Sequence, residues 1–259
     1  MKFFSSYQSG FNSFFVEIGE MGNFTGRYFR ELFSRPFEFR EFLKQCYQMG
    51  NKSLLLVCVT GFILGLVFTL QSRPTLMEFG AVSWMPSMIS ISIVREIGPV
   101  IIALICAGRI GSSIGAELGS MKVTEQIDAM EVSGTNPFKF LVVTRILAAT
   151  IMLPILVIIG DFVALIGSAI IENTKGDVSF LLYFNQVFEA LEFTDLIPAT
   201  IKTFFFGFAI GLVGCFKGYN SKKGTAGVGK ASNSAVVFTS MLLFVLDFIA
   251  VFITDIFYN

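Results

Sequence analysis

Five ionisable side chains lie inside long apolar stretches of this sequence, namely Arg95, Glu96, Asp161, Lys202 and Asp247. At the centre of a bilayer each would cost about 2.5–3.5 kcal/mol on the insertion scale, so such groups persist where they pair or face a watered cavity. With about 1.5 Å of helical rise per residue, we place all of them near the bilayer midplane or in its outer half. They therefore predict either structural ion pairs or a site for a charged ligand.

The two interpretations use these charged groups differently. As ion pairs, Arg95 would contact Glu96 or Asp161, and Lys202 would contact Asp247. As a site, the groups would line a cavity open toward the outside, beside a proline that interrupts the helical hydrogen-bond ladder and allows a bend. The residues alone leave both interpretations open. The candidate binding residues are Arg95, Glu96, Pro99, Asp161, Lys202 and Asp247.

The composition excludes several classes of protein. Charged residues make up 15% of the 259 residues, against about 25% in soluble domains, and the mean hydropathy is +0.72. A net charge of zero argues against a nucleic-acid partner. Histidine is absent and the four cysteines are widely spaced, which excludes histidine metal sites and Ser-His-Asp triads and indicates reduced thiols. We therefore expect a membrane protein without a metal or another cofactor.

Long apolar runs predict the fold. A helix needs about 20 mostly apolar residues to cross the hydrocarbon core of a bilayer. We therefore expect an all-α integral membrane protein whose membrane domain covers residues 50–259 and contains five transmembrane helices. The predicted transmembrane helices cover residues 54–71, 81–108, 140–171, 196–216 and 235–257.

Basic residues predict how these helices are oriented. Fourteen Lys and Arg residues fall in the segments on one side of the predicted helices, against Arg73 and Lys175 on the other. Because Lys and Arg are retained in cytoplasmic connections, we predict a cytoplasmic N-terminus and a periplasmic C-terminus.

Residues 1–49 combine many phenylalanines with charges of both signs. Phe29, Leu32 and Phe33 recur at helical spacing, and arginines flank them. This pattern is typical of amphipathic interfacial helices whose rings sink into the bilayer while their cations meet the headgroups. The alternative is a helix packed on the protein's own loops.

Three residues carry predictions about packing. Gly61 and Gly65 form a G-x-x-x-G pattern, which permits close approach of two helices, and we favour packing within the chain over a dimer seam. Arg145 lies near the cytoplasmic end of the third predicted helix. We expect its side chain to extend to the headgroup layer.

Residues 121–132 predict a short amphipathic helix between the second and third transmembrane helices. An apolar stripe runs along it, and acidic residues recur beside the stripe at i, i+3 and i+6. Such a helix fits a groove in a partner protein, although an ordinary surface helix has the same pattern. The stripe consists of Val123, Ile127 and Met130, and the acids are Glu125, Asp128 and Glu131.

The stretch from Arg95 to Pro137 can be read as one motif. It begins R-E-I-G-P and continues from Ala107 as A-G-R-I-G-S-S-I-G-A-E-L-G-S-M-K-V-T-E-Q-I-D-A-M-E-V-S-G-T-N-P. This motif closely resembles the MlaE (YrbE) family of ABC-transporter permeases, which move phospholipids or other lipids across the cell envelope. The resemblance extends over nearly the whole chain. It includes Gly61, Gly65 and Gln71, Lys202, Gly227-Val228-Gly229 and Leu246-Asp247-Phe248.

The resemblance implies an assembly and a place in the cell. It implies a homodimer in the inner membrane, with a cytoplasmic ABC ATPase below each half and an external MCE-type lipid-binding protein. Phospholipid would be the substrate, held beside the Arg95–Glu96 pair, and the short acidic helix would be the coupling helix that receives the motion of the ATPase. The residues assigned to this coupling are Glu117, Met121, Val123, Glu125, Ile127, Asp128, Met130 and Glu131.

Other functions remain as alternatives. Gly224–Ala231 nearly fits a phosphate-binding loop, but Ala231 has no hydroxyl for magnesium and the segment follows a membrane helix rather than a strand. We therefore expect a permease subunit without an ATPase motif of its own. A membrane enzyme that uses Glu96, Asp161 or Asp247 as acid or base lacks a histidine and a nucleophile elbow. A secondary transporter usually has internal repeats, which we do not detect.

Overall fold

The computed structural model describes residues 2–176, 178–222 and 224–258, and side chains within residues 15–257 of these segments. Every regular element in them is helical, which confirms the all-α prediction. The α-helices are α1 (Lys2–Leu32), α2 (Phe39–Glu78), α3 (Met85–Ser92), α4 (Gly98–Cys106), α5 (Ser112–Val123), α6 (Gln126–Val132), α7 (Thr144–Gly176), α8 (Phe180–Ala190), α9 (Phe193–Tyr219) and α10 (Thr225–Tyr258). A 3₁₀ turn, η1 (Val82–Trp84), and three π-helical segments, η2 (Ile93–Ile97), η3 (Ala107–Gly111) and η4 (Phe138–Val143), join them.

Five helical stretches in the described residues are long and apolar enough to cross a membrane, as predicted. They are longer than the predicted runs, because α2, for example, has 40 residues and would measure about 60 Å at helical rise. The hydrocarbon core is about 30 Å thick, so α2 extends well beyond it. Residues 39–49 belong to this same helix and continue directly into the first span. The five stretches are Phe39–Glu78, Val82–Val123, Phe138–Gly176, Phe193–Tyr219 and Thr225–Phe257.

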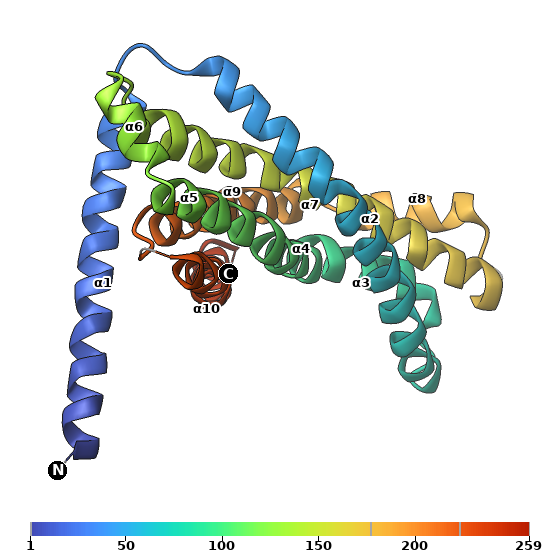
Figure 1. Ribbon diagram of the computed structural model, residues 1–259. Helices are drawn as coiled ribbons and strands as arrows, with labels where there is room; N and C mark the ends of the chain where they lie inside the picture. Colours follow the sequence, from blue (N-terminus) through green and yellow to red (C-terminus); the bar gives the residue numbers. More distant parts are fainter. Residues whose placement is uncertain (1, 177, 223, 259) are drawn as a thin grey trace.

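The spanning helices form one bundle in which α7 is central, because it packs against both α2 and α9 (Figure 1). Helix α10 packs against α9 and α5 at one side of this bundle. The N-terminal part of α1 projects away from the bundle at a steep angle, and the C-terminal end of α1 lies near α6. The elements that carry the intramembrane charges are therefore neighbours, although they are far apart in the sequence.

Helix α1 is a single helix of 31 residues. Its C-terminal half contacts the bundle through the buried rings of Phe24 and Tyr28, and the guanidinium of Arg27 lies 4.2 Å from the centre of the Phe138 ring. Phe33, which directly follows α1, is 83% exposed. One face of α1 is thus packed on the protein itself, and its place in the headgroup layer stays a prediction.

Helices α2 and α7 meet through small residues. A Cβ at Gly61 would lie 2.5 Å from the carbonyl oxygen of Gly160, and one at Gly167 would lie 2.5 Å from that of Phe62. A Cβ at Gly65 would collide with the carbonyl oxygen of Ala164. The G-x-x-x-G pattern therefore serves packing within the chain, as predicted, because it lets two backbones approach closely where lipid provides no hydrophobic driving force.

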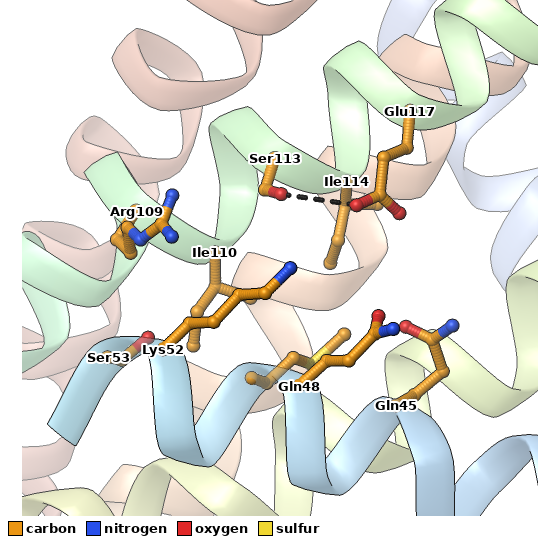
Figure 2. Close-up of a pocket in the computed structure, with 10 residues that line it drawn as sticks. Gln45, Gln48, Lys52, Ser53, Arg109, Ile110, Ser113, Ile114 and Glu117 are labelled. Atoms are coloured by element: carbon orange, nitrogen blue, oxygen red, sulfur yellow. Dashed lines mark hydrogen bonds between the residues drawn. The ribbon is translucent and has the colours of Figure 1, made fainter.

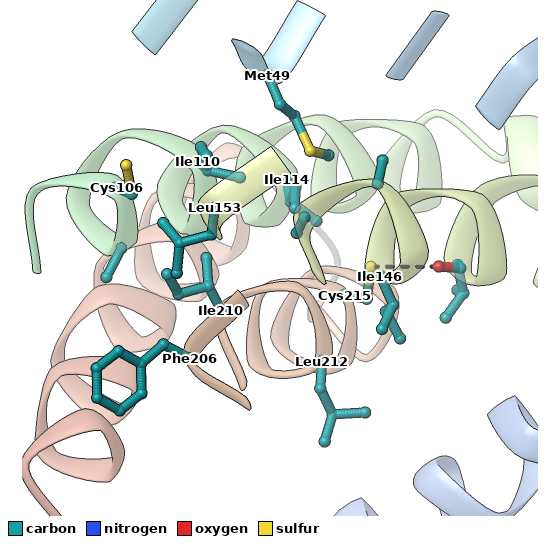
Figure 3. Close-up of a cluster of buried hydrophobic side chains, with 14 of the residues drawn as sticks. Met49, Cys106, Ile110, Ile114, Ile146, Leu153, Phe206, Ile210, Leu212 and Cys215 are labelled. Carbon is teal, nitrogen blue, oxygen red and sulfur yellow. Dashed lines mark hydrogen bonds between the residues drawn. The ribbon is translucent and has the colours of Figure 1, made fainter. Parts of the chain in front are cut away.

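The main apolar core lies where α4, α5, α7 and α9 meet (Figure 3). Ile146 and Ile210 are completely buried there. Cys106 and Cys215 are buried in the same core as free thiols, and Cys215 Sγ lies 3.9 Å from the carbonyl oxygen of Val142. All four cysteines are free, which confirms the prediction of reduced thiols.

Polar contacts fasten α8 and the far end of α2 to α7. The hydroxyl of Tyr183 donates to Ser168 Oγ over 2.7 Å, and Ser168 Oγ lies 2.7 Å from Thr69 Oγ1. Arg73 Nη1 donates to the buried carboxylate of Glu172 over 2.7 Å. Burial raises the pKa of Tyr183 to about 12, so its hydroxyl stays protonated and remains a donor. This network holds α8 against the end of the bundle.

We predict opposite effects of the same substitution at two helical glycines. Gly65→Ala places a methyl group against the α7 backbone, and we expect it to lower the free energy of unfolding by about 1–3 kcal/mol. Gly229→Ala meets nothing within 4 Å and gains helix propensity, so it should leave stability unchanged or raise it by up to about 1 kcal/mol. Thermal unfolding of both variants in one mild detergent tests this. Equal stability of the two variants would contradict the close α2–α7 contact.

Candidate functional site

The ammonium group of Lys202 is the centre of the charged cluster. Its Nζ lies 2.6 Å from Glu96 Oε2 and 3.0 Å from Asp247 Oδ1. The Lys202 side chain is only 6% exposed, whereas those of Glu96 and Asp247 are 39% and 20% exposed. One buried cation therefore contacts two carboxylates, and the formal charges of the three groups sum to −1.

Three different spans supply this cluster. Glu96 lies on the π-helical segment η2, Lys202 on α9 and Asp247 on α10. The wider π turn ends directly before Gly98 and Pro99, where the proline cannot donate a backbone hydrogen bond. Single π turns of this kind occur frequently at functional sites.

Asp161 on α7 lies beside this cluster without joining it. A Cβ at Gly98 would collide with Asp161 Oδ1, so the carboxyl group packs directly on the backbone next to η2. Asp161 is 7% exposed, and its Oδ1 has no hydrogen-bond partner among the described residues. A buried polar atom without a partner is costly and calls for an explanation.

Arg95 contacts a residue that the sequence did not single out. Its Nη1 lies 3.7 Å from Asp195 Oδ1 at the start of α9, so the pairing with Glu96 or Asp161 that the ion-pair interpretation offered is wrong. The pairing of Lys202 with Asp247 in that interpretation is confirmed, with Glu96 as a second partner. Asp195 also belongs to a capping box with Glu192 at the N-terminus of α9, and this spacing was the signal available in the sequence.

Two mostly apolar cavities flank α9. One lies between α9 and α10, has a volume of about 670 Å³ and includes Lys202 in its wall, together with Phe205 and Leu246. The other has a volume of about 500 Å³ and lies among α4, α7, α8 and α9, with Pro99 and Asp161 in its wall. Three of the six predicted site residues therefore line cavities, Lys202 in one and Pro99 and Asp161 in the other, whereas Arg95, Glu96 and Asp247 are in neither lining. Among the described residues, no group of three or more His, Cys, Asp or Glu side chains is placed to hold a metal ion.

The predicted acidic helix of residues 121–132 is divided into two helices. Helix α5 ends at Val123 and α6 begins at Gln126, because Glu125 adopts a left-handed conformation with φ of 57°. Ile127 is buried in the protein's own core, and Met121 and Met130 pack against that core. Two of the three residues of the predicted stripe, Ile127 and Met130, therefore face the core, whereas Val123 is only half-buried.

Three acids on α6 and at its N-cap, together with one residue that the pattern missed, form the outer face of this segment. Glu125, Asp128 and Glu131 are exposed, and Asp128 accepts a hydrogen bond from Lys122 Nζ over 2.9 Å. Val132 is 91% exposed. Val132 does not fit the 3–4 residue spacing of the apolar stripe, so the sequence pattern did not identify it.

Glu117 anchors the buried Arg145. The Arg145 guanidinium lies 3.3 Å from Glu117 Oε2 and donates to the carbonyl oxygen of Leu141 over 3.0 Å. Arg145 is only 5% exposed, so the prediction that it extends to the headgroups is wrong. The carboxylate of Glu117 compensates its charge within the protein instead.

Five long apolar helices, a charged cluster among them and adjacent apolar cavities define a polytopic membrane protein with charged groups between its spanning helices. The family described as Permease MlaE matches residues 42–253. The chain belongs to this family. It is therefore a transporter permease rather than an enzyme, and it is a multi-pass membrane protein.

Relatives agree with this assignment. The chain is 37% identical to a probable ABC transporter permease protein of Rickettsia bellii over 242 residues, which are 93% of this chain and 92% of the relative. It is 33% identical to the probable ABC transporter permease protein slr1045 of Synechocystis, over 86% of this chain and 85% of the relative. It is 32% identical to the chloroplastic protein TRIGALACTOSYLDIACYLGLYCEROL 1 of Arabidopsis thaliana, over 81% of this chain and 60% of that protein.

We predict that the Lys202 cluster stabilises the fold as a unit. Lys202→Met leaves two carboxylates facing each other without their cation, and we expect a loss of about 3 kcal/mol in the free energy of unfolding. Adding Glu96→Gln and Asp247→Asn removes the uncompensated charges and should restore more than half of this loss. Unfolding of both variants in detergent measures the difference. A Lys202→Met protein as stable as the wild type would show that the Lys202 ammonium group does not stabilise the fold.

Proposed function

We propose that this chain is the membrane subunit of an ATP-driven ABC transporter that moves phospholipid or a related lipid between the inner membrane and the outer envelope. The observation that carries the proposal is the position of Lys202, a buried cation in the wall of an apolar cavity of about 670 Å³. Such cavities with few polar groups are typical of small-molecule sites. A lipid has matching chemistry, with an anionic phosphate for the ammonium and acyl chains for the apolar wall.

The charged groups would exchange partners when lipid binds. Glu96 is the more exposed of the two carboxylates on Lys202, so it is the partner that a lipid phosphate would displace. Arg95 is 46% exposed and makes one ion pair, at 3.7 Å from Asp195, so its guanidinium is available for a second anionic oxygen. Pro99 and Asp161 would border the lipid from the second cavity.

One relative supports a lipid as the substrate. The name of the Arabidopsis protein contains that of a diacylglycerol lipid with three galactose units. Its similarity covers 81% of this chain. A lipid substrate explains why the cavities are mostly apolar and why the cations lie inside the spans.

A second copy of the chain would cover α10. Only 11% of the most apolar window of α10 is buried, against 28–61% for the other spans. Phe244, Phe248 and Phe252 are exposed along this helix, beside the open cavity that Lys202 borders. A homodimer that places α10 at its interface would bury these rings and close the cavity from the membrane.

The coupling segment and the orientation complete the proposal. A cytoplasmic ATPase would contact α6 through its exposed acids and Val132, while the buried Ile127 transmits movement of α6 to the core. Glu117 would take part through its contact with Arg145 on α7. An MCE-type protein would dock on the opposite, periplasmic side, where α8 exposes Leu181 and Phe188.

We predict that Glu96→Arg blocks transport. The new cation would stand beside Lys202 and repel it, and we expect a rate lowered by at least about tenfold, which corresponds to about 1.4 kcal/mol. The measurement is ATP-dependent transfer of a fluorescent phospholipid from proteoliposomes that contain the complete transporter. Glu78→Arg, an exposed charge reversal at the end of α2, is the matched control. If the Glu96→Arg variant assembles normally and transfers lipid at the wild-type rate, the assignment of the site is wrong.

We predict that charge reversal on α6 uncouples the ATPase. Glu125→Lys combined with Glu131→Lys reverses two exposed acids, so recovery of the ATPase subunit in a pull-down should fall by about tenfold or more, as expected for several lost rim contacts. Glu78→Lys with Glu189→Lys reverses two exposed acids elsewhere and should recover the ATPase normally. Equal recovery with both double variants would refute the coupling role of α6.

A further inference from the structure

A narrow polar cleft opens between α2 and the second span, far in sequence from the Lys202 cluster (Figure 2). One wall comes from α2 and the other from η3 and α5. The side chains of Lys52 and Arg109 reach toward it from opposite walls. Its volume is about 30 Å³, which accommodates only one or two water-sized groups.

The cleft carries excess positive charge. Lys52 and Arg109 make no ion pair with any described residue. Glu117 is the one carboxylate in the lining, and its charge is compensated by Arg145. Two uncompensated cations on facing helices would repel each other, so the arrangement favours an anion between them.

A buried hydroxyl in the wall of the cleft has no partner. Ser53 is 1% exposed, and its Oγ makes no hydrogen bond in the described structure. Other helical serines, such as Ser90 and Ser92, donate to a carbonyl one turn earlier. The free Ser53 hydroxyl is therefore a donor that a ligand oxygen would satisfy.

The surroundings of the cleft are suited to a lipid. Directly after Ser53, α2 exposes Leu54, Leu55 and Leu56, and the helix continues into its apolar span. On the other wall, Arg109 lies in η3, a π turn of the kind that often marks functional sites. A headgroup in the cleft would leave its acyl chains on the exposed apolar face of α2.

We propose that Lys52, Ser53 and Arg109 bind the phosphate group of an anionic membrane phospholipid that joins α2 to the second span. The small cleft admits the phosphate oxygens, and the rest of the lipid stays outside against α2. This lipid is separate from the one transported, because its site is built from α2, η3 and α5 and borders neither cavity beside α9. It would brace α2, whose apolar window is only 28% buried by protein, against the bundle.

The test uses the full chain in phosphatidylcholine vesicles with a photoactivatable phosphatidylglycerol and peptide mapping of the cross-links. We expect cross-links to residues 45–56 that unlabelled phosphatidylglycerol suppresses and dioleoylglycerol, which has no phosphate, does not. Lys52→Gln with Arg109→Gln should weaken binding by about 25-fold, at about fivefold for each cation. Arg40→Gln with Lys44→Gln removes two charges from α2 outside the cleft and should bind as the wild type does.

A third variant separates binding from folding. Ser53→Ala should weaken the cross-link, while the thermal stability of the protein without added phosphatidylglycerol stays equal or rises, because an unpartnered buried hydroxyl is lost. Unchanged labelling in the Lys52/Arg109 variant, or an equal loss in the Arg40/Lys44 variant, would overturn the proposal. Displacement by millimolar inorganic phosphate would assign the cleft to free phosphate and overturn the lipid. Cross-links to α9 and α10 report on the transport cavity in the same sample. A loss of labelling at residues 45–56 alone therefore concerns the cleft and not the transport site.

Discussion

The ammonium group of Lys202 must be compensated inside a bilayer, and this requirement ties three spanning helices together. Its partners Glu96 and Asp247 are 106 and 45 residues away in sequence, on the second and fifth spans. An ion in hydrocarbon is tolerated when partners or water replace its hydration. The positions of η2, α9 and α10 are therefore linked, and a change in the partners of Lys202 changes how these helices meet.

Close backbone contact provides the second constraint, and it differs in kind. Helices α2 and α7 touch through Gly61, Gly65 and Gly167, where any side chain would meet a carbonyl group. Such a contact has one geometry and resists sliding, whereas ion pairs can exchange partners. The bundle thus combines a rigid α2–α7 pair with a charged junction at α9 and α10. This division fits a transporter in which one part holds its shape while another opens to a ligand.

Sequence reasoning succeeded where the controlling interactions are local. Runs of apolar residues give the number of spans because each helix satisfies its own backbone hydrogen bonds in lipid. The pairing of Lys202 with Asp247 was also anticipated, since both cost free energy alone. The prediction that Arg145 extends to the headgroups was wrong, because its partner Glu117 lies 28 residues away on another helix. Sequence reasoning also missed Asp195, because spacing along a chain does not show which helix ends lie side by side.

The sequence by itself determined an all-helical membrane protein with five spans, reduced cysteines and the MlaE family. These properties depend on composition, on helical periodicity and on motifs that each lie within one segment. Only the tertiary structure decided which charges meet, where α5 ends and α6 begins, and that Lys202 lines a different cavity from Pro99 and Asp161. Helix packing brings distant residues together and turns Glu125 into a left-handed break. Neither effect leaves a trace in the helical periodicity of the sequence.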